Sequence, residues 1–309
     1  MDQPLSRRSS IVEKKQRKKR KSFWFSSRVL FVLPAMIYLI AIFLYPIYRT
    51  IMMGFQDYSI SSIGSGSSPF IGLENYIHLF TQPLMWQVFM NTLYFVLGSI
   101  VFQVTIGMAL AVFFTKKFPL NSLIRGLLLV PWLLPLIVSG TAFRWILDQS
   151  HGVLNWVLMK LHFISEPIGW LVSPDTSLLS TIITNIWVGI PFSMVILYSG
   201  LKDIPNELYE AGAIDGCSAW QKFWYITLPS LKPVLAIVLT LALIYTLKVF
   251  DIVMILTGGG PANSSQILST WSYDLSFQQL SFGEGAAVSN IMILISLVFC
   301  FFYVKATKE

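Results

Sequence analysis

Six long apolar runs alternate with polar segments along the chain. They cover Val29–Met53, Val88–Phe114, Ser122–Leu147, Ser177–Gly200, Pro233–Leu256 and Ala286–Val304. A helix needs about 20 mostly apolar residues to cross a bilayer, and each run approaches or exceeds that length. Several runs contain proline, which favours kinked helices packed around a path over a simple anchor. The pattern predicts an all-α membrane protein with six transmembrane helices.

The composition supports this interpretation and excludes others. Hydrophobic residues make up 55% of the chain and charged residues 12%, whereas soluble globular domains carry about 25% charged residues. A water-soluble fold and intrinsic disorder are therefore both disfavoured. The two cysteines, Cys217 and Cys300, are too few for a disulfide scaffold or a four-thiolate metal site. We expect no metal site and no catalytic residues.

The net charge of +7 lies almost entirely at the N-terminus. Residues 1–28 carry ten basic and two acidic side chains, and the remaining chain carries 12 and 13. Such a tail could bind nucleic acid, but its position beside an apolar run favours a signal that keeps the N-terminus in the cytoplasm. With that orientation, loops 115–121 and 201–232 face the cytoplasm and are rich in lysine and arginine, whereas all three histidines lie outside. We expect both termini in the cytoplasm.

The cytoplasmic loop of residues 201–232 has the sequence pattern of a folded unit. Asn206 can cap a helix that starts at Glu207, and Gly216 can end it in a left-handed turn. Ser218 and Gln221 have the spacing of a capping box for a second helix. Leu228 and Pro229 then redirect the chain towards the fifth apolar run. The loop is either a docking surface or a solvated connector.

The spacing within this loop resembles the EAA motif of ABC-importer permeases. That motif is E-A-A, three residues, G, nine residues and I-x-L-P. Here it corresponds to Glu210, Ala211 and Gly212, then Gly216, then Ile226, Leu228 and Pro229. Gly212 stands where the family usually has alanine, and glycine costs about 1 kcal/mol of helix stability relative to alanine. We refer to residues 201–232 as the EAA loop.

Other stretches resemble one branch of that family, the first permease subunit of maltose- and glycerophosphate-type importers. They are Tyr45-Pro46, Asn91-Thr92, Pro131 with Pro135, Ile214-Asp215-Gly216, and Phe250-Asp251 followed by Leu256-Thr257 and Gly259-Gly260-Pro261. The resemblance begins near Val29 and continues to the end of the chain. It implies the type I ABC importer permease fold in the cell membrane of a prokaryote.

The resemblance also implies partners. Such a permease pairs with a second, homologous permease and two cytoplasmic ATPase subunits, and an extracellular solute-binding protein delivers the solute. Glu210 would contact the ATPase, Ala211 and Gly212 would allow close approach, and Asp215 and Gly216 would shape the turn. Because the chain contains no G-x4-G-K-[S/T] phosphate loop, ATP and Mg²⁺ would bind to the partner ATPase. The chain itself would be neither an enzyme nor a cofactor carrier, and we expect no nucleic-acid partner.

The domain organisation follows from the spans and the resemblance. Residues 1–28 form a basic cytoplasmic tail, and residues 29–87 hold the first transmembrane helix and an extracellular loop. Residues 88–304 form the core permease domain, which includes the EAA loop, and residues 305–309 form a second cytoplasmic tail.

Polar residues inside the spans are candidates for the translocation path. Lys248 and Asp251 are three residues apart, so on one helix they could pair or line the route. Trp187 could stack on a sugar or simply pack. Three amides could bind a sugar hydroxyl or bridge helices: Asn91, Gln103 and Asn185. The turn formed by Gly259, Gly260 and Pro261 could contact the binding protein or only end a helix.

Three transport functions compete. The first is ATP-driven import of a sugar or oligosaccharide, and the second is the same machinery importing another solute such as glycerol-3-phosphate. A stand-alone secondary transporter is the third, but no clear internal repeat supports it. A membrane-embedded enzyme lacks a cluster of His, Asp or Glu at membrane depth.

Overall fold

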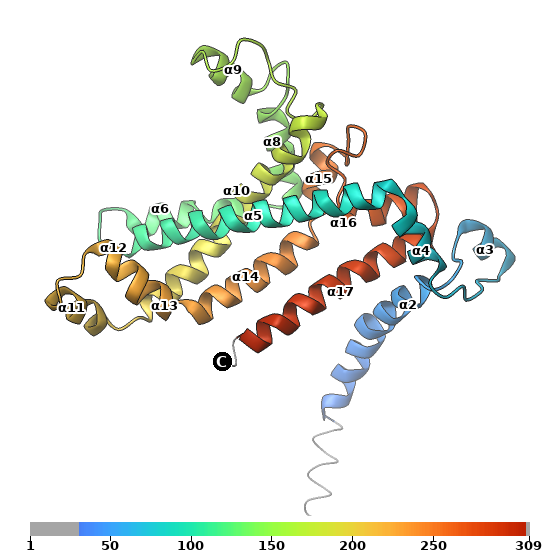
Figure 1. Ribbon diagram of the computed structural model, residues 1–309, viewed down its shortest axis with the longest axis horizontal. Helices are drawn as coiled ribbons and strands as arrows, with labels where there is room; N and C mark the ends of the chain where they lie inside the picture. Colours follow the sequence, from blue (N-terminus) through green and yellow to red (C-terminus); the bar gives the residue numbers. More distant parts are fainter. Residues whose placement is uncertain (1–30, 307–309) are drawn as a thin grey trace, which may run out of the picture. The chain divides into compact units, whose positions relative to one another are not determined.

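The computed structural model describes residues 31–306, so the predicted basic tail of residues 1–28 and the last three residues lie outside the described part (Figure 1). The chain divides into two units, one ending at Met52 and one starting at Met53. The described part of the first unit belongs to a single apolar helical segment, Phe31–Met53, which contains a π-helical stretch, η1 (Ile40–Leu44), followed by α2 (Tyr45–Met53). Its residues match the first predicted span.

The second unit is helical throughout, and within residues 31–306 only two isolated β-bridges occur. Its elements, in chain order, are α3 (Ile60–Ser65), α4 (Glu74–Thr81), α5 (Pro83–Thr115), α6 (Asn121–Leu127), α7 (Val130–Leu133), α8 (Leu136–Ile146), α9 (Val153–Lys160), α10 (Pro174–Lys202), α11 (Asn206–Ile214), α12 (Ala219–Lys222), η2 (Phe223–Thr227), α13 (Leu228–Ser230), α14 (Lys232–Leu247), α15 (Asp251–Leu256), α16 (Leu268–Tyr273), η3 (Asp274–Gln278) and α17 (Phe282–Ala306).

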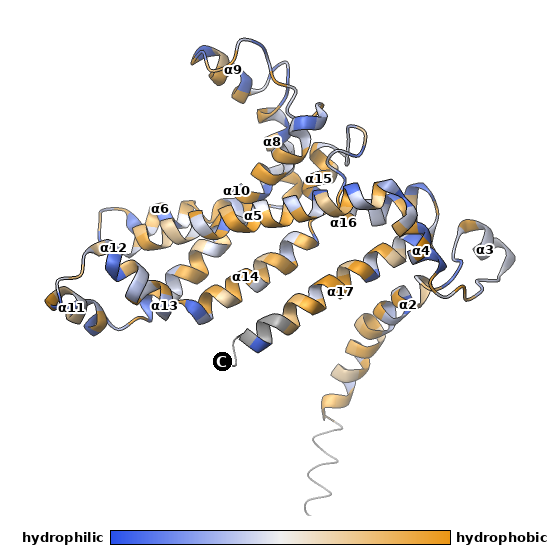
Figure 2. Ribbon diagram, in the orientation of Figure 1, coloured by the Kyte–Doolittle hydropathy of each residue, from blue (hydrophilic) through white to orange (hydrophobic). Residues whose placement is uncertain are grey.

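Apolar residues run along nearly the full length of the long helices (Figure 2). Within the described residues, four helices are long and apolar enough to cross a membrane, and two bent helix pairs raise the number to six. The second, fourth and sixth predicted spans correspond to α5, α10 and α17, each a few residues longer than predicted. The all-helical prediction is confirmed.

The third span is broken rather than merely kinked. The α6–α7 segment and α8 meet at 96°, and the break falls between Leu133 and Leu136. Leu134 has extended backbone angles, and Pro135 caps α8 at its N-terminus. Proline disfavours helical geometry in the residue before it, which explains why the chain turns at Leu134.

The prediction of one continuous fifth helix over Pro233–Leu256 is wrong. α14 ends at Leu247, and α15 starts only at Asp251. The hydroxyl of Ser269 in α16 donates to the carbonyl of Val249 in the gap, so a neighbouring helix satisfies a carbonyl that the break leaves free.

The predicted outer loop between residues 257 and 285 is also more ordered than a plain connection. It contains α16 and η3, in which Leu268, Trp271 and Leu275 are at most 2% exposed. They pack with residues of α4, α5 and α17 in one apolar cluster. Serines and other polar residues between these positions lower the average hydropathy, so a search for apolar runs does not find this helix.

The long helices α5 and α10 form the centre of the second unit. They lie side by side, and glycines let them approach closely: a Cβ on Gly189 would lie 2.3 Å from the Gln103 side chain, and one on Gly107 would lie 2.7 Å from Cβ of Ser193. Inside a membrane the hydrophobic effect does not drive helices together, so tight packing depends on van der Waals contact at small residues.

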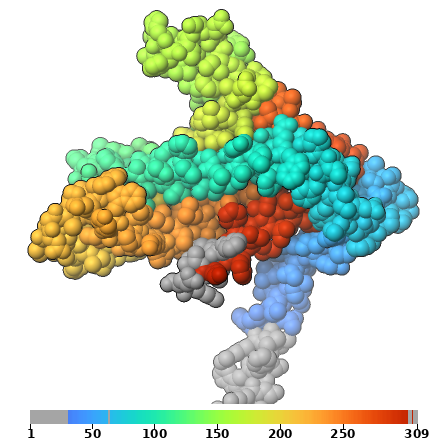
Figure 3. All heavy atoms as spheres, in the orientation of Figure 1, coloured from blue at the N-terminus to red at the C-terminus, as the bar shows by residue number. Residues whose placement is uncertain are grey.

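Two apolar clusters close the unit at opposite ends. One joins the end of α5, the end of α10 and the EAA loop, and includes Phe114, Leu201 and Leu231. The other joins α4, the start of α5, α16 and the start of α17, and includes Leu79 and Met85. In Figure 3, residues of the EAA loop form one end of the unit. The predicted inner and outer loops therefore gather at separate ends.

We predict that Gly107→Ala destabilises the protein, because the new methyl group would also lie 3.0 Å from the backbone nitrogen of Met194, which has no freedom to move aside. Overpacking of this kind costs about 1–3 kcal/mol. The melting temperature in detergent should fall by several degrees. Gly126→Ala in α6 is the control, since a Cβ added there would have no heavy atom within 4 Å. Equal melting temperatures for the two variants would contradict this packing account.

Candidate functional site

The first helix of the EAA loop starts one residue earlier than predicted. α11 begins at Asn206, and Pro205 occupies the capping position, so the Asn206 side chain is not the cap. Proline at this boundary has a backbone suited to entering a helix and needs no amide partner. Glu207 lies in the first turn, where a carboxylate is favoured by the helix dipole.

The end of α11 is the predicted left-handed turn. Gly216 has φ +76°, a conformation that costs glycine little and side-chain-bearing residues more. The amide of Cys217 donates to the Gly212 carbonyl at 2.8 Å, and the amide of Gly216 donates to the Ala213 carbonyl at 3.1 Å. This pair of hydrogen bonds is a Schellman motif, which satisfies carbonyls at the end of the helix.

The second half of the EAA loop begins with the predicted capping box. Ser218 Oγ accepts from the amide of Gln221, and the Gln221 side chain accepts from the amide of Ser218 at 2.8 Å. Pro229, however, does not stop the helix. The chain continues through the π-helical η2 and through α13, and it bends by 69° only between Ser230 and Lys232. Pro229 is at the start of α13, where its missing amide is not needed.

The two parts of the EAA motif meet in space. Gly212 is buried in α11, and a Cβ at its position would lie 2.9 Å from Cδ1 of Ile226 in η2. Glycine therefore allows α11 to pack directly on the segment that carries Ile226. The hydroxyls of Tyr209 and Thr227 are 2.9 Å apart and form a second link between the same elements.

The opposite side of the EAA loop is exposed. Glu210, Ala211 and Asp215 are exposed, as is Pro229. Ile214 is 87% exposed and Trp220 is 70% exposed. Leu228 is half-buried. The EAA loop thus presents acidic and large apolar side chains from a folded support.

Two interior amides of α5 hydrogen bond to the backbone of other segments. The Gln103 side chain in α5 donates to the Asn185 carbonyl in α10 at 2.8 Å. The Asn91 side chain donates to the carbonyls of Asn263 and Gln266, at 3.2 and 3.0 Å. Gln103 thus bridges two helices, one of the two roles that the sequence left open for it, and Asn91 connects α5 to the turn before α16. Asn185 Nδ2 is buried and has no hydrogen-bond partner within residues 31–306.

Lys248 and Asp251 do not lie on one helix. They are separated by the break between α14 and α15, and no ion pair joins them in the described part of the chain. Lys248 Nζ instead lies 5.5 Å from the ring centroid of Tyr245. The expectation that they share one helix is therefore wrong, since α14 ends at Leu247, and of the two roles left open the ion pair is not formed.

Aromatic side chains from three elements form a row that sequence reasoning missed. Phe192 of α10 lies between Trp132 of α7 and Tyr245 of α14, with ring centroids 5.8 and 5.6 Å apart. Trp132 and Tyr245 are about half exposed. Trp187 packs on Phe143 of α8, with the two ring centroids 5.2 Å apart, and about a third of its surface stays exposed. It lies in α10, about one turn before Pro191. No spacing within one segment connects these residues.

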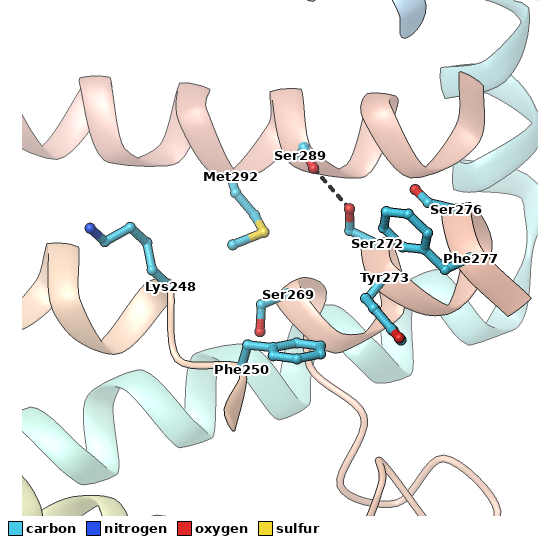
Figure 4. A pocket seen from close by; sticks show the side chains of 9 residues that line it. All are labelled: Lys248, Phe250, Ser269, Ser272, Tyr273, Ser276, Phe277, Ser289 and Met292. Carbon is cyan, nitrogen blue, oxygen red and sulfur yellow. Dashed lines mark hydrogen bonds between the residues drawn. The ribbon is translucent and has the colours of Figure 1, made fainter. Parts of the chain in front are cut away.

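A pocket of about 390 Å³ lies between the end of α14, the α16–η3 segment and α17. Its walls combine hydroxyl groups with aromatic rings. Two of the lining residues, Ser272 and Ser289, hydrogen bond to each other at 2.8 Å (Figure 4). The Lys248 ammonium points away from the serines. Spacings of three and four residues in α16–η3 put one side of this helix on the pocket, a signal that was available in the sequence. The lining residues are Lys248, Phe250, Ser269, Ser272, Tyr273, Ser276, Phe277, Ser289 and Met292.

The predicted outer turn is firmly held. Gly258 and Gly259 have φ values of +62° and +88°, and the Gly260–Pro261 peptide is cis. Ser265 Oγ donates to the Gly260 carbonyl at 2.7 Å. Together with the Asn91 bonds, these contacts fix the turn against the outer end of α5. Within residues 31–306 no cluster of His, Cys, Asp and Glu side chains could hold a metal ion.

Residues 103–306 match the family model described as the binding-protein-dependent transport system inner membrane component. This range is about two thirds of the chain and contains the whole EAA loop. The chain belongs to this family. It is a multi-pass membrane transport component, and the resemblance seen in the EAA spacing is confirmed.

Relatives of this permease carry names of sugar transporters. It is 33% identical over 240 residues to the trehalose/maltose transport system permease protein of Thermococcus litoralis, covering 78% of this chain and 80% of that one. It is 34% identical to the sulfoquinovosyl glycerol transport system permease protein of Agrobacterium fabrum, covering 91% and 90%. It is 32% identical to the lactose transport system permease protein of Rhizobium radiobacter, covering 91% and 93%.

The permease also shares its fold with a solved structure. A chain of a bacterial ABC transporter involved in the import of the acidic polysaccharide alginate superposes with a TM-score of 0.79 at 23% sequence identity. The match covers 95% of this chain and 98% of that one. The predicted ABC importer permease fold is therefore confirmed.

We predict that Gly216→Val disturbs the turn of the EAA loop while Gly216→Asn preserves it. A β-branched residue at φ +76° is strongly disfavoured, whereas asparagine tolerates this region. Hydrogen exchange of the Cys217 amide, which the Schellman motif protects, measures the difference. Faster exchange is expected in the valine variant only. Equal protection in both variants would contradict the role assigned to the left-handed turn.

Proposed function

We propose that this permease is one half of the translocation path of an ATP-driven importer for a sugar or oligosaccharide. The observation that carries the proposal is the EAA loop, in which the two segments of the motif fold into one unit with an exposed acidic and apolar side. A connector that is only solvated has no need of a Schellman motif, a capping box and close packing at Gly212.

On the cytoplasmic side, the partners are two ATPase subunits that bind ATP and Mg²⁺. Glu210 and Asp215 offer charge to the ATPase, and the exposed Ile214 and Trp220 offer apolar area. Exposed apolar area bordered by polar groups is typical of interaction sites. A second, homologous permease completes the path, and movement of the ATPases switches the bundle between inward-facing and outward-facing states.

The carbohydrate assignment is supported by the chemistry of the pocket and by the names of the relatives. Aromatic rings offer apolar faces to the C–H side of a sugar, and hydroxyl groups exchange hydrogen bonds with its hydroxyls. The pocket with Tyr273 and Phe277 combines both, and Trp187 and the row at Phe192 add further exposed rings. The relatives are named for trehalose/maltose, lactose and sulfoquinovosyl glycerol.

On the outer side, we propose that the rigid turn at Gly259, Gly260 and Pro261 contacts an extracellular solute-binding protein. The turn is held by the bonds from Asn91 and Ser265, so it can meet a partner without losing conformational freedom. A related alginate transporter has been solved with a substrate-bound periplasmic protein.

The coupling role predicts a specific loss with Glu210→Lys. Reversing this exposed charge should weaken co-purification of the ATPase and abolish most ATP-driven uptake, while the permease still inserts. Glu207→Lys is the matched control on the same helix, expected to cost only a few tenths of a kcal/mol in dipole interaction. If both variants import sugar as well as the wild type does, the EAA loop does not couple through Glu210.

The pocket predicts that Phe277→Leu weakens sugar transport. The ring lies 5.0 Å from that of Tyr273, and losing its face should lower uptake several-fold and raise the apparent KM, with unchanged sugar affinity of the binding protein. Phe299→Leu, at a half-exposed position in α17 outside the pocket lining, is the control. A panel of maltose, trehalose, lactose and glycerol-3-phosphate identifies the solute class, and import of glycerol-3-phosphate alone would contradict the carbohydrate assignment.

A further inference from the structure

One face of α11 attaches it to the rest of the permease. Of its nine residues, only Gly212 is buried and only Tyr209 is half-buried, and the others are exposed. The two lie three residues apart, so they share a face of the helix. Tyr209 also packs its ring against the apolar cluster that closes this end of the bundle. The attachment of α11 therefore depends on very few contacts.

The Tyr209 hydroxyl joins the two halves of the EAA loop. It is 2.9 Å from Oγ1 of Thr227, 18 residues further along the chain at the end of η2. Thr227 is 5% exposed, so little water competes for the bond. A hydrogen bond in such a place is costly to lose, because the partner left behind stays buried and unsatisfied.

The direction of this hydrogen bond follows from a second one. Thr227 Oγ1 is also 3.3 Å from the carbonyl oxygen of Lys222. A carbonyl can only accept, so the Thr227 hydroxyl donates to Lys222 and the Tyr209 hydroxyl donates to Thr227. Tyr209 is thus connected to the wide turn of η2, and π-helical turns often occur at functional sites.

We infer that Tyr209 is a positioning residue that makes α11 move as one body with η2, which leads through α13 into α14. The inference rests on the proposed function, since it concerns how a push on α11 reaches the transmembrane helices. Gly212 supplies close contact with Ile226 but resists only compression. The Tyr209–Thr227 hydrogen bond also resists separation and sliding of α11 relative to η2. It therefore transmits movement of α11 both towards the transmembrane helices and away from them during the transport cycle.

The test is Tyr209→Phe in the complete transporter, reconstituted with its ATPase, partner permease and binding protein. Sugar import and ATP hydrolysis are measured together, with maltose, trehalose and lactose as probes. We expect normal assembly, continued ATP hydrolysis, and a roughly three- to tenfold fall in sugar imported per ATP, the effect of losing one buried hydrogen bond. A merely structural role would lower the amount of complex and leave that ratio unchanged.

Two further variants keep the test decisive. Tyr225→Phe removes a hydroxyl from a 78% exposed tyrosine of the same segment, and this hydroxyl makes no hydrogen bond within residues 31–306, so the ratio should not change. Thr227→Val removes the same bond from the other side, together with the bond from Thr227 to Lys222, so adding Tyr209→Phe to Thr227→Val should give little additional loss.

The possible outcomes separate the two proposals. An unchanged ratio in Tyr209→Phe, or losses that add in the double variant, would overturn the positioning role. A wild-type complex that hydrolyses ATP but imports none of the sugars would contradict the proposed function instead.

Discussion

Close packing of α5 on α10 is the interaction on which the rest of the permease depends. Lipid tails are as apolar as the helices, so burial of hydrophobic area does not hold these two together, and they rely on van der Waals contact at small residues. Gly107 and Gly189 provide it, and Gln103 fills the space above Gly189 with a hydrogen bond to the Asn185 carbonyl. Every other long helix of the second unit packs against this pair, either directly or through the two end clusters.

The breaks in the third and fifth spans have a common physical consequence. A helix that ends inside a membrane leaves backbone groups unpaired, and this is tolerated where protein or water satisfies them. In the fifth span, Ser269 takes up the Val249 carbonyl, and the serine-rich α16 that supplies it also forms a wall of the pocket. Interruption of the helix and creation of a polar pocket are therefore two aspects of one arrangement.

The sequence predicted the features that depend on local pattern. Apolar run length located the spans, and residue chemistry located the Gly216 turn and the Ser218 capping box, because both are decided within a few residues. The Lys248–Asp251 pair failed since it assumed that an apolar run is one helix. The meeting of Tyr209 with Thr227, and of Trp132 with Phe192 and Tyr245, depends on how separate segments fold together, and one sequence carries no periodic signal for that.

α14 connects the EAA loop directly with the pocket. Its first residue follows α13 and η2 of the EAA loop, and the residue after its last one, Lys248, lies at the pocket. Sixteen helical residues at 1.5 Å each span about 24 Å, most of the hydrocarbon thickness. A regular helix resists bending much more than a loop does, so tilting at the bend near Leu231 displaces the other end of α14, near Lys248. The bend at one end of α14 and the break at the other are therefore the places where the motion of such a rod would be accommodated, and two residues at the break, Lys248 and Phe250, line the pocket.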